Sequence, residues 1–224
     1  MRIILRQIKR FFDFLLGDLS DQIFWKYIHL LRKDWKDGYL DNDCLKQGHR
    51  DFLIDLITRN ENIIKILELG CGDGINLRKI AKINPSFELV GVDINKFAIE
   101  TGKSKIKNQN FGIELIIGNF KNLNKFKDNQ FDIVFSDAAL MYVDDKNIIR
   151  VLKEAFRISK AKLIICEQHT DKSSFYNDKW IHNYKKNLET FVDAKMVETH
   201  DIKNSNRTGD WAEFGKIIEV KKYN

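Results

Sequence analysis

Short apolar runs alternate with amphipathic stretches from residue 65 onward. The runs are rich in β-branched residues and are bounded by polar or glycine-containing segments, which is typical of buried strands. They cover residues 66–69, 89–92, 115–117, 133–135 and 163–166. Helical periodicity lies between several of them, over residues 76–83, 96–107 and 146–158. Repeated strand–helix–strand units predict a parallel sheet with helices on both faces.

The end of the chain departs from this alternation. A helix is expected around residues 180–191, followed by two strand-like runs near residues 196–202 and 216–220. An ordinary dinucleotide-binding domain does not need such a hairpin-like pair. Before the first strand the apolar spacing is helical. We therefore predict an α/β domain over residues 62–224, preceded by a helical extension over residues 1–61.

The extension begins with a basic amphipathic segment. Residues 1–17 alternate basic and apolar side chains, which predicts a helix that could lie on an anionic membrane, pack on the domain or contact a second subunit. It is not a secretory signal, because charges interrupt the apolar positions. No apolar run reaches the ~18 residues of a transmembrane helix. Further helices are expected over residues 24–35 and from about residue 46 to residue 57.

Composition indicates a folded protein. Of 224 residues, 43% are hydrophobic and 31% are charged. The net charge of +6 fits nucleic acid, an anionic membrane or an acidic substrate as well as simple solubility. The lysines are scattered and no aromatic–basic RNA-binding module is visible, so nucleic acid is not the favoured partner. Cys44, Cys71 and Cys166 form no metal-binding spacing, so we expect no metal and a cytoplasmic location, to which residues 1–17 could add membrane association.

The strongest chemical signal is the segment KILELGCGDGINL, residues 65–77, with the order strand, glycine-rich turn, helix. Gly70, Gly72 and Gly74 allow a sharp turn close to a ligand, and the next helix offers unpaired amide groups. Asp93 closes the following strand about 20 residues further on, where an acid can bind both hydroxyls of a ribose. Alone, the glycines could make a plain turn and Asp93 could cap a helix. Together they favour a nucleotide cofactor.

Two cofactors use such a pair. A nicotinamide dinucleotide site has the spacing G-x-G-x-x-G, whereas Ile75 and Asn76 follow the glycines here and the pattern is incomplete. Glu68, just before the turn, would repel phosphates but suits a cationic ligand. S-adenosylmethionine (SAM) is such a ligand, because it carries a sulfonium and an ammonium group. A nicotinamide enzyme remains the alternative.

At these residues the chain resembles the class I SAM-dependent methyltransferases. Their first motif, acid-hydrophobic-Gly-x-Gly-x-Gly, matches residues 68–74, and their second, an acid closing the next strand, matches Asp93. The resemblance implies SAM as the cofactor and S-adenosylhomocysteine as the product. The residues that it assigns to the cofactor site are Glu68, Gly70, Cys71, Gly72, Gly74, Asp93, Ile94, Asn119, Phe120 and Asp137.

The resemblance extends from about residue 62 to the C-terminus. In IIGNF, residues 116–120, family members often have an acid where Asn119 stands, but Asn119 can still accept a hydrogen bond from adenine. FDIVFSDAALMYV, residues 131–143, looks like the fourth strand and the loop that faces cofactor and acceptor. RISKAKLIICEQ resembles the fifth strand. The expected fold is an α/β three-layer sandwich with a mostly parallel seven-stranded sheet, a reversed last strand and the N-terminal helical extension.

Methyl transfer from SAM is a direct displacement, so the protein mainly aligns the acceptor and excludes water. A hydroxyl acceptor also needs a general base, whereas an amine need only arrive deprotonated. His169 follows the fifth strand, where the loops of an open α/β sheet meet the ligand crevice. Asp137 and Tyr142 follow the fourth strand. We predict these three as catalytic residues, with His182 and His49 as further candidates.

The acceptor class is narrowed by what the chain lacks. Its only proline is Pro85, which excludes the Asn/Asp-Pro-Pro-aromatic motif of adenine and cytosine amino-methyltransferases and the Pro-Cys nucleophile of cytosine C5 enzymes. Trp180, Tyr184 and Trp211 could line an apolar or sugar-binding pocket, or simply pack at the sheet edge. Residues 35–49 could form part of a lid over the cofactor.

These patterns predict an enzyme that methylates an O or N atom of a small-molecule acceptor, with a saccharide as one candidate. An RNA or protein methyltransferase is the alternative, for which the net charge of +6 is the only support. A non-catalytic, SAM-binding partner subunit is a further alternative. It would bind the cofactor without turning over any acceptor.

Overall fold

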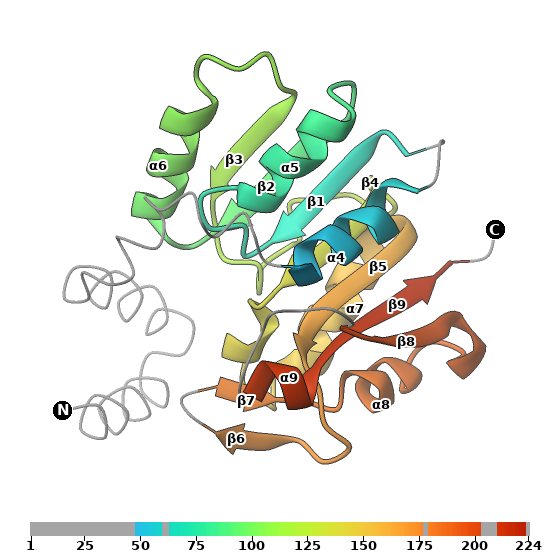
Figure 1. The fold of residues 1–224 in the computed structure, drawn as a ribbon. Coiled ribbons are helices and arrows are strands. Elements are labelled where there is room, and N and C mark those ends of the chain that lie inside the picture. Colours follow the sequence, from blue (N-terminus) through green and yellow to red (C-terminus); the bar gives the residue numbers. More distant parts are fainter. Residues whose placement is uncertain (1–47, 60–62, 177–178, 203–209, 223–224) are drawn as a thin grey trace, which may run out of the picture.

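The computed structural model describes residues 48–59, 63–176, 179–202 and 210–222. Its centre is a seven-stranded sheet with the order β3-β2-β1-β4-β5-β9-β8 (Figure 1). Strands β1 to β5 pair in parallel, and β9 runs antiparallel between β5 and β8. The predicted sheet and its reversed last strand are therefore confirmed. The strands of this sheet are β1 (Lys65–Leu69), β2 (Glu88–Asp93), β3 (Ile113–Ile117), β4 (Phe131–Asp137), β5 (Ser159–Gln168), β8 (Val197–Asp201) and β9 (Gly215–Lys221).

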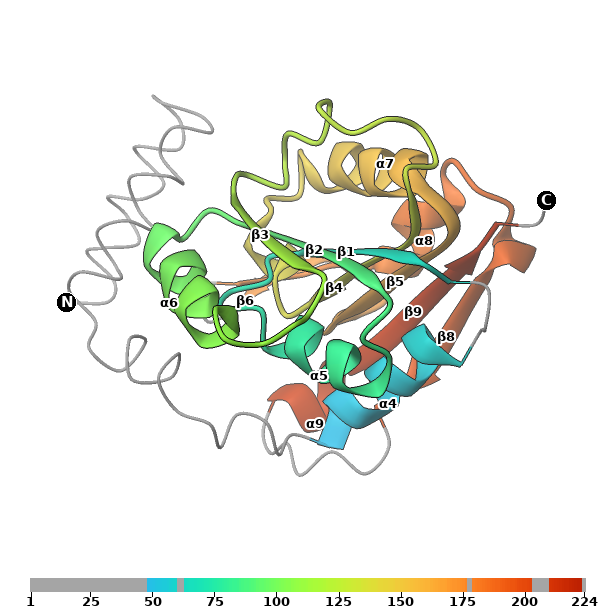
Figure 2. The same ribbon diagram turned by 90° about the horizontal axis from the view of Figure 1, so that it is seen from above.

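Helices cover both faces of the sheet. Seen along the sheet, α4 and α5 lie on one side and α7 and α8 on the other (Figure 2). None of the helices within the described ranges is long and apolar enough to cross a membrane. The helices are α4 (Gly48–Thr58), α5 (Ile75–Ile83), α6 (Lys96–Ile106), α7 (Ile148–Ile158), α8 (Tyr184–Glu189) and α9 (Asp210–Phe214), with short 3-10 helices η2 (Leu140–Tyr142) and η3 (Ala194–Met196).

An apolar core on each face holds the three layers together. On α7 the apolar side chains recur at helical spacing, and this stripe is buried against the sheet. It consists of Ile148, Val151, Leu152, Ala155 and Ile158. On the opposite face, α4 buries Leu53, Leu56 and Ile57 in the same core as Ile66 of β1. Each fully buried aliphatic side chain of this size contributes about 1.5–3 kcal/mol.

Most of the predicted N-terminal extension lies outside the described residues. This applies to residues 1–47, and therefore to the amphipathic segment 1–17, to Cys44 and to most of the predicted lid. The division into residues 1–61 and 62–224 stays a prediction. The helix α4, which the sequence assigned to the extension, packs against α5 and contributes to the core of the sheet.

The helix predicted over residues 180–191 is shorter than expected. Trp180 lies in strand β7 (Lys179–Ile181), which pairs antiparallel with β6 (Ser174–Tyr176). The helix α8 begins only after Asn183, whose side chain accepts a hydrogen bond from the N–H of Lys186 at 2.9 Å. The predicted helix was therefore wrong for residues 180–183. Over so few positions, aromatic residues at strand spacing cannot be distinguished from the apolar face of a helix.

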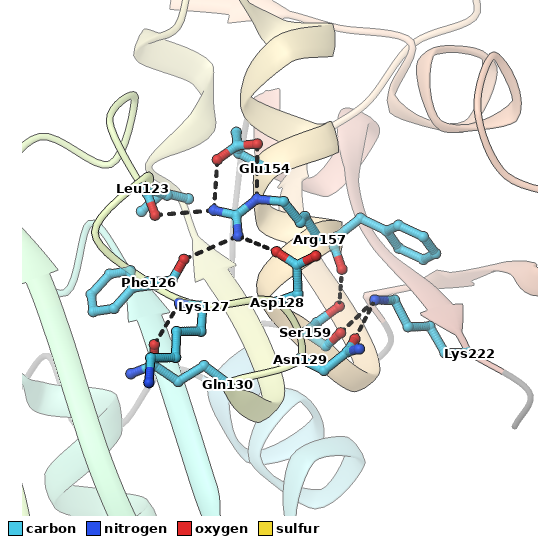
Figure 3. Close-up of polar contacts among 11 residues, drawn as sticks. Leu123, Phe126, Lys127, Asp128, Asn129, Gln130, Glu154, Arg157, Ser159 and Lys222 are labelled. Carbon is cyan, nitrogen blue, oxygen red and sulfur yellow. Dashed lines mark hydrogen bonds and ion pairs between the residues drawn. The ribbon is translucent and has the colours of Figure 1, made fainter.

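A side-chain network on α7 anchors the loop between β3 and β4 (Figure 3). The Arg157 guanidinium donates to the carbonyl oxygen of Phe126 at 3.0 Å and to the carboxylate of Asp128 at 2.6 Å. Glu154 orients the guanidinium through hydrogen bonds of 3.0 and 2.8 Å. The network therefore holds the loop at Leu123, Phe126 and Asp128, a few residues after Asn119 and Phe120, which were predicted to contact the cofactor.

Candidate functional site

A glycine turn, residues 70–74, follows β1 at the C-terminal edge of the sheet. Gly70, Gly72 and Gly74 have positive φ angles of 73°, 55° and 73°, which other residues rarely adopt. At Gly70 a second constraint applies, because a Cβ there would lie 2.3 Å from the Cβ of Ala139. The sharp turn expected from the sequence is therefore present, and it packs closely against the segment after β4.

Asp93, at the end of β2, holds the glycine turn in place. Its Oδ2 accepts a hydrogen bond from the N–H of Gly72 at 2.8 Å, and its Oδ1 accepts one from the N–H of Asn95 at 2.7 Å. The cap of α6 is Asn95 itself, whose side chain accepts from the N–H of Phe97 at 3.1 Å. A carboxylate oxygen can accept more than one hydrogen bond, so this geometry is compatible with a ligand hydroxyl at Asp93.

A buried acid cluster, consisting of Glu68, Asn76 and Asp137, lies next to the turn. Glu68 is 1% exposed, and its Oε1 accepts a hydrogen bond from Asn76 Nδ2 at 2.7 Å. The same nitrogen donates to Asp137 Oδ2 at 3.2 Å. Within the described residues, the buried atoms Glu68 Oε2 and Asn76 Oδ1 have no hydrogen-bond partner. The acid cluster therefore presents buried acceptors to a ligand that donates hydrogen bonds or carries positive charge.

The protonation of Glu68 depends on these surroundings. Burial raises the pKa of Glu68 well above its ordinary value, and the neighbouring carboxylate of Asp137 acts in the same direction. The hydrogen bond from Asn76 opposes them by stabilising the charged form. A cationic ligand would also favour the charged form. Binding of a cation and ionisation of Glu68 are therefore expected to be coupled.

The carboxylate of Asp137 connects the end of β4 to α4. His49 Nε2 lies 3.3 Å from both of its oxygens, and Arg50 Nε lies 3.3 Å from its Oδ2. The sequence indicated Asp137 as a site residue and His49 as part of a covering helix, but it gave no reason to expect Arg50 here. The position of Arg50 makes Asp137 an organiser of the site as well as a candidate catalytic residue.

Cys71 and Ile94, two residues that the resemblance assigned to the cofactor site, lie beside the glycine turn and Asp93. Cys71 is buried, and a Cβ on Gly91 would lie 2.6 Å from its Sγ, so the side chain packs on β2. Burial raises the pKa of this thiol well above its ordinary value, which keeps it protonated. Ile94 follows Asp93 and is half-buried.

The segment after β3 approaches the glycine turn from the other side. The Cε1 atom of Phe120 lies 3.5 Å from the position that a Cβ on Gly70 would take, so the ring lies beside the turn. The Oδ1 atom of Asn119 accepts a hydrogen bond from the N–H of Lys121 at 2.9 Å. This contact directs the side-chain oxygen of Asn119 toward its own loop.

The predicted catalytic histidine lies just beyond β5. His169 Nδ1 accepts a hydrogen bond from the N–H of Tyr184 at 3.2 Å. Burial lowers the pKa of His169, so the ring is neutral near pH 7. A neutral ring that accepts at Nδ1 carries its proton on Nε2, and His169 therefore presents a donor. Tyr142 lies in η2 and is half-buried.

Five rings form an aromatic row beyond the end of β5. Trp180 stacks on His182 with ring centroids 5.8 Å apart and an interplanar angle of 9°. His182 Nε2 donates to the carbonyl oxygen of Val143 at 2.9 Å, so the row is tied to the segment after β4. The rings of the aromatic row are Phe175, Trp180, His182, Tyr184 and His169. Its position fits the crevice where open α/β sheets bind their ligands.

Sequence reasoning missed Glu167, at the end of β5. The side chain is fully buried, and its Oε1 accepts hydrogen bonds from the N–H groups of Ala139 and Leu140 at 2.8 and 2.7 Å. Burial raises the pKa of Glu167 to about 7, against the lowering effect of these two amides. A signal was present, because an acid that ends a buried apolar run occupies the same position as Asp93 and Asp137. Asn76 had no comparable signal.

Two groups in the described part of the chain bring three metal-ligand atoms within 4.8 Å of one another. One consists of His49, Asp137 and Cys166 and has the Arg50 guanidinium beside its carboxylate. The other consists of Glu198, His200 and Glu219. Cations already compensate its charges, because Lys162 and Lys221 lie 2.7 Å from Glu219 and Glu198. We call Glu198, His200, Glu219, Lys162 and Lys221 the edge network. Because each of the two groups has a cationic side chain beside its carboxylates, neither offers an uncompensated site for a metal.

Comparisons with known proteins agree with this geometry. A family model described as a methyltransferase domain matches residues 60–221. The chain is 32% identical over 107 residues to malonyl-[acyl-carrier protein] O-methyltransferase 1 of Ilyobacter polytropus, and 35% identical over 98 residues to a demethylmenaquinone methyltransferase of a Geobacillus species. These alignments cover 47% and 43% of this chain and 39% and 41% of the relatives. The chain thus matches about two fifths of the length of these curated relatives.

A solved structure shares the fold. A SAM-dependent methyltransferase from Aquifex aeolicus matches with a TM-score of 0.57 and 13% identity, over 80% of this chain and 93% of its own. At such low identity the likeness concerns the fold. The family model matches residues 60–221. This range contains the glycine turn, Asp93 at the end of β2 and all seven strands of the large sheet. The chain therefore belongs to the methyltransferase domain family.

Proposed function

We propose that the protein is a SAM-dependent methyltransferase that acts on an O or N atom of a small-molecule acceptor. The observation that carries this proposal is the acid cluster, in which Glu68 Oε2 and Asn76 Oδ1 are buried without a partner in the described part of the chain. SAM carries an ammonium group, which donates hydrogen bonds, and a positively charged sulfonium. Both are complementary to buried acceptors, whereas the pyrophosphate of a dinucleotide would be repelled.

The other predicted residues have distinct parts in binding the cofactor. Asp93 would accept hydrogen bonds from the ribose hydroxyls, as acids at this position do in open α/β folds. Ile94 and Phe120 would give the adenine apolar contacts, with Asn119 at its edge. The backbone of the glycine turn would allow the methionine part to approach closely. Glu68 would then face the positively charged end of the cofactor.

Bound SAM supplies an activated methyl group that a nucleophile displaces directly. The chain has to align the acceptor and keep water away. We assign these tasks to Tyr142 and His169, which follow β4 and β5 at the edge of the sheet that carries the glycine turn. His169, with its proton on Nε2, would donate a hydrogen bond to the acceptor. Asp137 would keep α4 over the site through its contacts with His49 and Arg50.

Within the aromatic row, His182 and Tyr184 are fully buried and pack in the interior, so the surface left for a small acceptor with a ring or an apolar face is that of His169, Phe175 and Trp180. Stacked and edge-on rings bind such groups well, and a saccharide ring is one candidate. The names of the two relatives point to an acyl and to a quinone acceptor, which leaves a saccharide without specific support. An RNA acceptor has in its favour the net charge of +6 and a match of 33% identity over 79 residues to a ribosomal RNA large subunit methyltransferase, which covers 35% of this chain; a protein acceptor has the charge alone.

Calorimetric titration with SAM and S-adenosylhomocysteine tests the proposal directly. We expect micromolar binding to the wild type and a loss of about 100-fold in Asp93→Ala, because hydrogen bonds to a charged acceptor are lost. Asp55→Ala is the matched control, since Asp55 is an exposed aspartate on α4 that pairs with Arg59. Absence of SAM binding to the wild type would refute the proposal, and NAD would be titrated next. Binding without turnover of any acceptor would favour the partner-subunit alternative.

A further inference from the structure

We infer that Glu167 is a positioning residue that holds residues 138–140 against the glycine turn and thereby sets the affinity of the turn for the cofactor. The second half of this inference rests on the proposed function, because it takes SAM as the ligand of the turn. The first half concerns the fold of the cofactor-free protein alone. Neither the motifs in the sequence nor the family match assigns a role to Glu167.

The first link is the set of hydrogen bonds that Glu167 accepts from the segment after β4. Its Oε1 accepts from the N–H groups of Ala139 and Leu140 at 2.8 and 2.7 Å and from Ser136 Oγ at 3.2 Å. Between these donors lies Ala138, with a φ of 59°. A non-glycine residue keeps such a conformation only where its surroundings impose it. Glu167 supplies that constraint from the neighbouring strand, together with the hydrogen bond that the N–H of Ala138 donates to the carbonyl oxygen of Cys166 at 3.0 Å.

The second link joins the same segment to the glycine turn. A Cβ placed on Gly70 would lie 2.3 Å from Ala139 Cβ and 3.6 Å from Ala139 Cα. The two backbones are therefore in close contact at the point where Glu167 fixes Ala139. A shift of Ala139 would change the space that the turn leaves for a ligand, because packed interiors transmit small displacements.

Chemistry at the carboxylate separates this role from that of a general base. Glu167 is fully buried, and one of its oxygens already accepts three hydrogen bonds. Its Oε2 and the Tyr184 hydroxyl are buried without a hydrogen-bond partner among the described residues. What the backbone requires is one acceptor oxygen, and a glutamine side chain supplies it. A methionine has a similar volume and supplies none.

Hydrogen exchange in the cofactor-free protein tests the first link. The amides of Ala139 and Leu140 should be protected in the wild type and in Glu167→Gln, and should exchange at least about tenfold faster in Glu167→Met, where both lose their acceptor. Equal protection of these two amides in all three proteins would overturn the inference. This result does not depend on SAM. If the wild type bound no SAM but showed this pattern, the proposed function would fail while the positioning role would stand.

Calorimetry with SAM tests the second link. We expect Glu167→Met to weaken SAM binding about tenfold and Glu167→Gln to restore it to within about threefold. The matched control is Glu219→Met, since Glu219 is a buried glutamate of the same sheet that pairs with Lys162 instead of the loop. It should lower the melting temperature and leave SAM affinity unchanged. If Glu219→Met lost as much SAM affinity as Glu167→Met, the loss would be due to general destabilisation of the fold, and the inference would be overturned.

A second variant keeps the test decisive if Glu167→Met does not fold. Ala139→Gly removes the side chain that packs on Gly70 and leaves both hydrogen bonds to Glu167 in place. We expect weaker SAM binding with the amide of Leu140 still protected. Unchanged SAM affinity in this variant would overturn the second link.

Discussion

Two regions of the sheet bury glutamates and surround them differently. In the edge network, Lys162 Nζ lies 2.7 Å from Glu219 Oε1, and the charge of the buried carboxylate is compensated. In the acid cluster, Glu68 receives one hydrogen bond from the neutral amide of Asn76 and forms no ion pair with any described residue, because the neighbouring Arg50 pairs with Asp137 and acts on Glu68 only at longer range. A buried carboxylate without a cation lowers stability. The comparison indicates that the edge network serves the fold, whereas the acid cluster is suited to a ligand that brings the missing charge.

The largest effect is expected from breaking the compensated pair. Lys162→Met should lower the free energy of unfolding by about 3–5 kcal/mol, because Glu219 would stay buried without its nearest cation. Urea denaturation measures this loss. SAM affinity should remain that of the wild type at temperatures where the variant is folded. A loss under 1 kcal/mol would mean that Lys221 and His200, at 3.9 and 3.5 Å from Glu219, already suffice as partners.

A pH series sharpens the comparison at Glu167. Its pKa of about 7 lies above the ordinary 4.5, so the folded protein keeps a proton that the unfolded chain releases. Stability from this group is therefore present below about pH 4.5 and is lost as the pH rises to about 7. Relative to Glu167→Gln, the wild type should lose about 2–3 kcal/mol between pH 5 and pH 8.

Urea denaturation of both proteins at each pH isolates this effect, because the other titrating groups are common to both. The charged or ionisable groups that act on Glu167 are Asp137 and Tyr184, and neither is changed in the variant. A stability difference that stays constant from pH 5 to pH 8 would contradict the prediction. A difference of opposite slope would mean that the carboxylate is ionised throughout.

The smallest effect is expected at Glu68, and it falls on binding instead of folding. Glu68→Gln keeps an acceptor for Asn76 and removes the uncompensated charge, so the variant should be as stable as the wild type or slightly more stable. SAM affinity should fall about tenfold, since a hydrogen bond to a charged group is replaced by one to a neutral group. Calorimetry and urea denaturation on the same preparation measure both. Unchanged affinity would place Glu68 among structural residues.

The sequence predicted the parts of the fold that depend on local spacing. The alternation of strands and helices, the glycine turn and the acid at Asp93 all follow from residues close together in the chain. The short strands β6 and β7 were missed, because three residues carry too little periodicity to separate a strand from a helix. Phe175 and Trp180 of the aromatic row lie on the hairpin of β6 and β7. Because this hairpin was missed, the sequence indicated some of these rings singly but not their contact with one another.

Contacts between distant residues account for the rest of the site. His49 and Asp137 are 88 positions apart, and Glu167 lies 28 positions from the Ala139 amide that it binds. A single sequence does not show which residues pair, because Asp137 and Glu167 each end a buried apolar run but nothing in their own segments identifies their partners. Asn76 illustrates this, because its amide nitrogen joins Glu68 and Asp137 from the first turn of a helix. Burial and hydrogen bonding assign these roles only once the strands are placed side by side.

The place of β9 in the sheet has a consequence for synthesis on the ribosome. β9 is the last of the described strands in the sequence, yet it lies between β5 and β8, and β8 has no other neighbour in this sheet. Residues 197–201 therefore emerge before the strand that they pair with. At ~5–20 residues per second, the open edge of β8 waits roughly one to four seconds for β9, and that of β5 roughly three to eleven seconds. An open strand edge can pair with another chain and start aggregation. Slower elongation through residues 202–221 therefore lengthens the time in which β5 and β8 are exposed to such pairing.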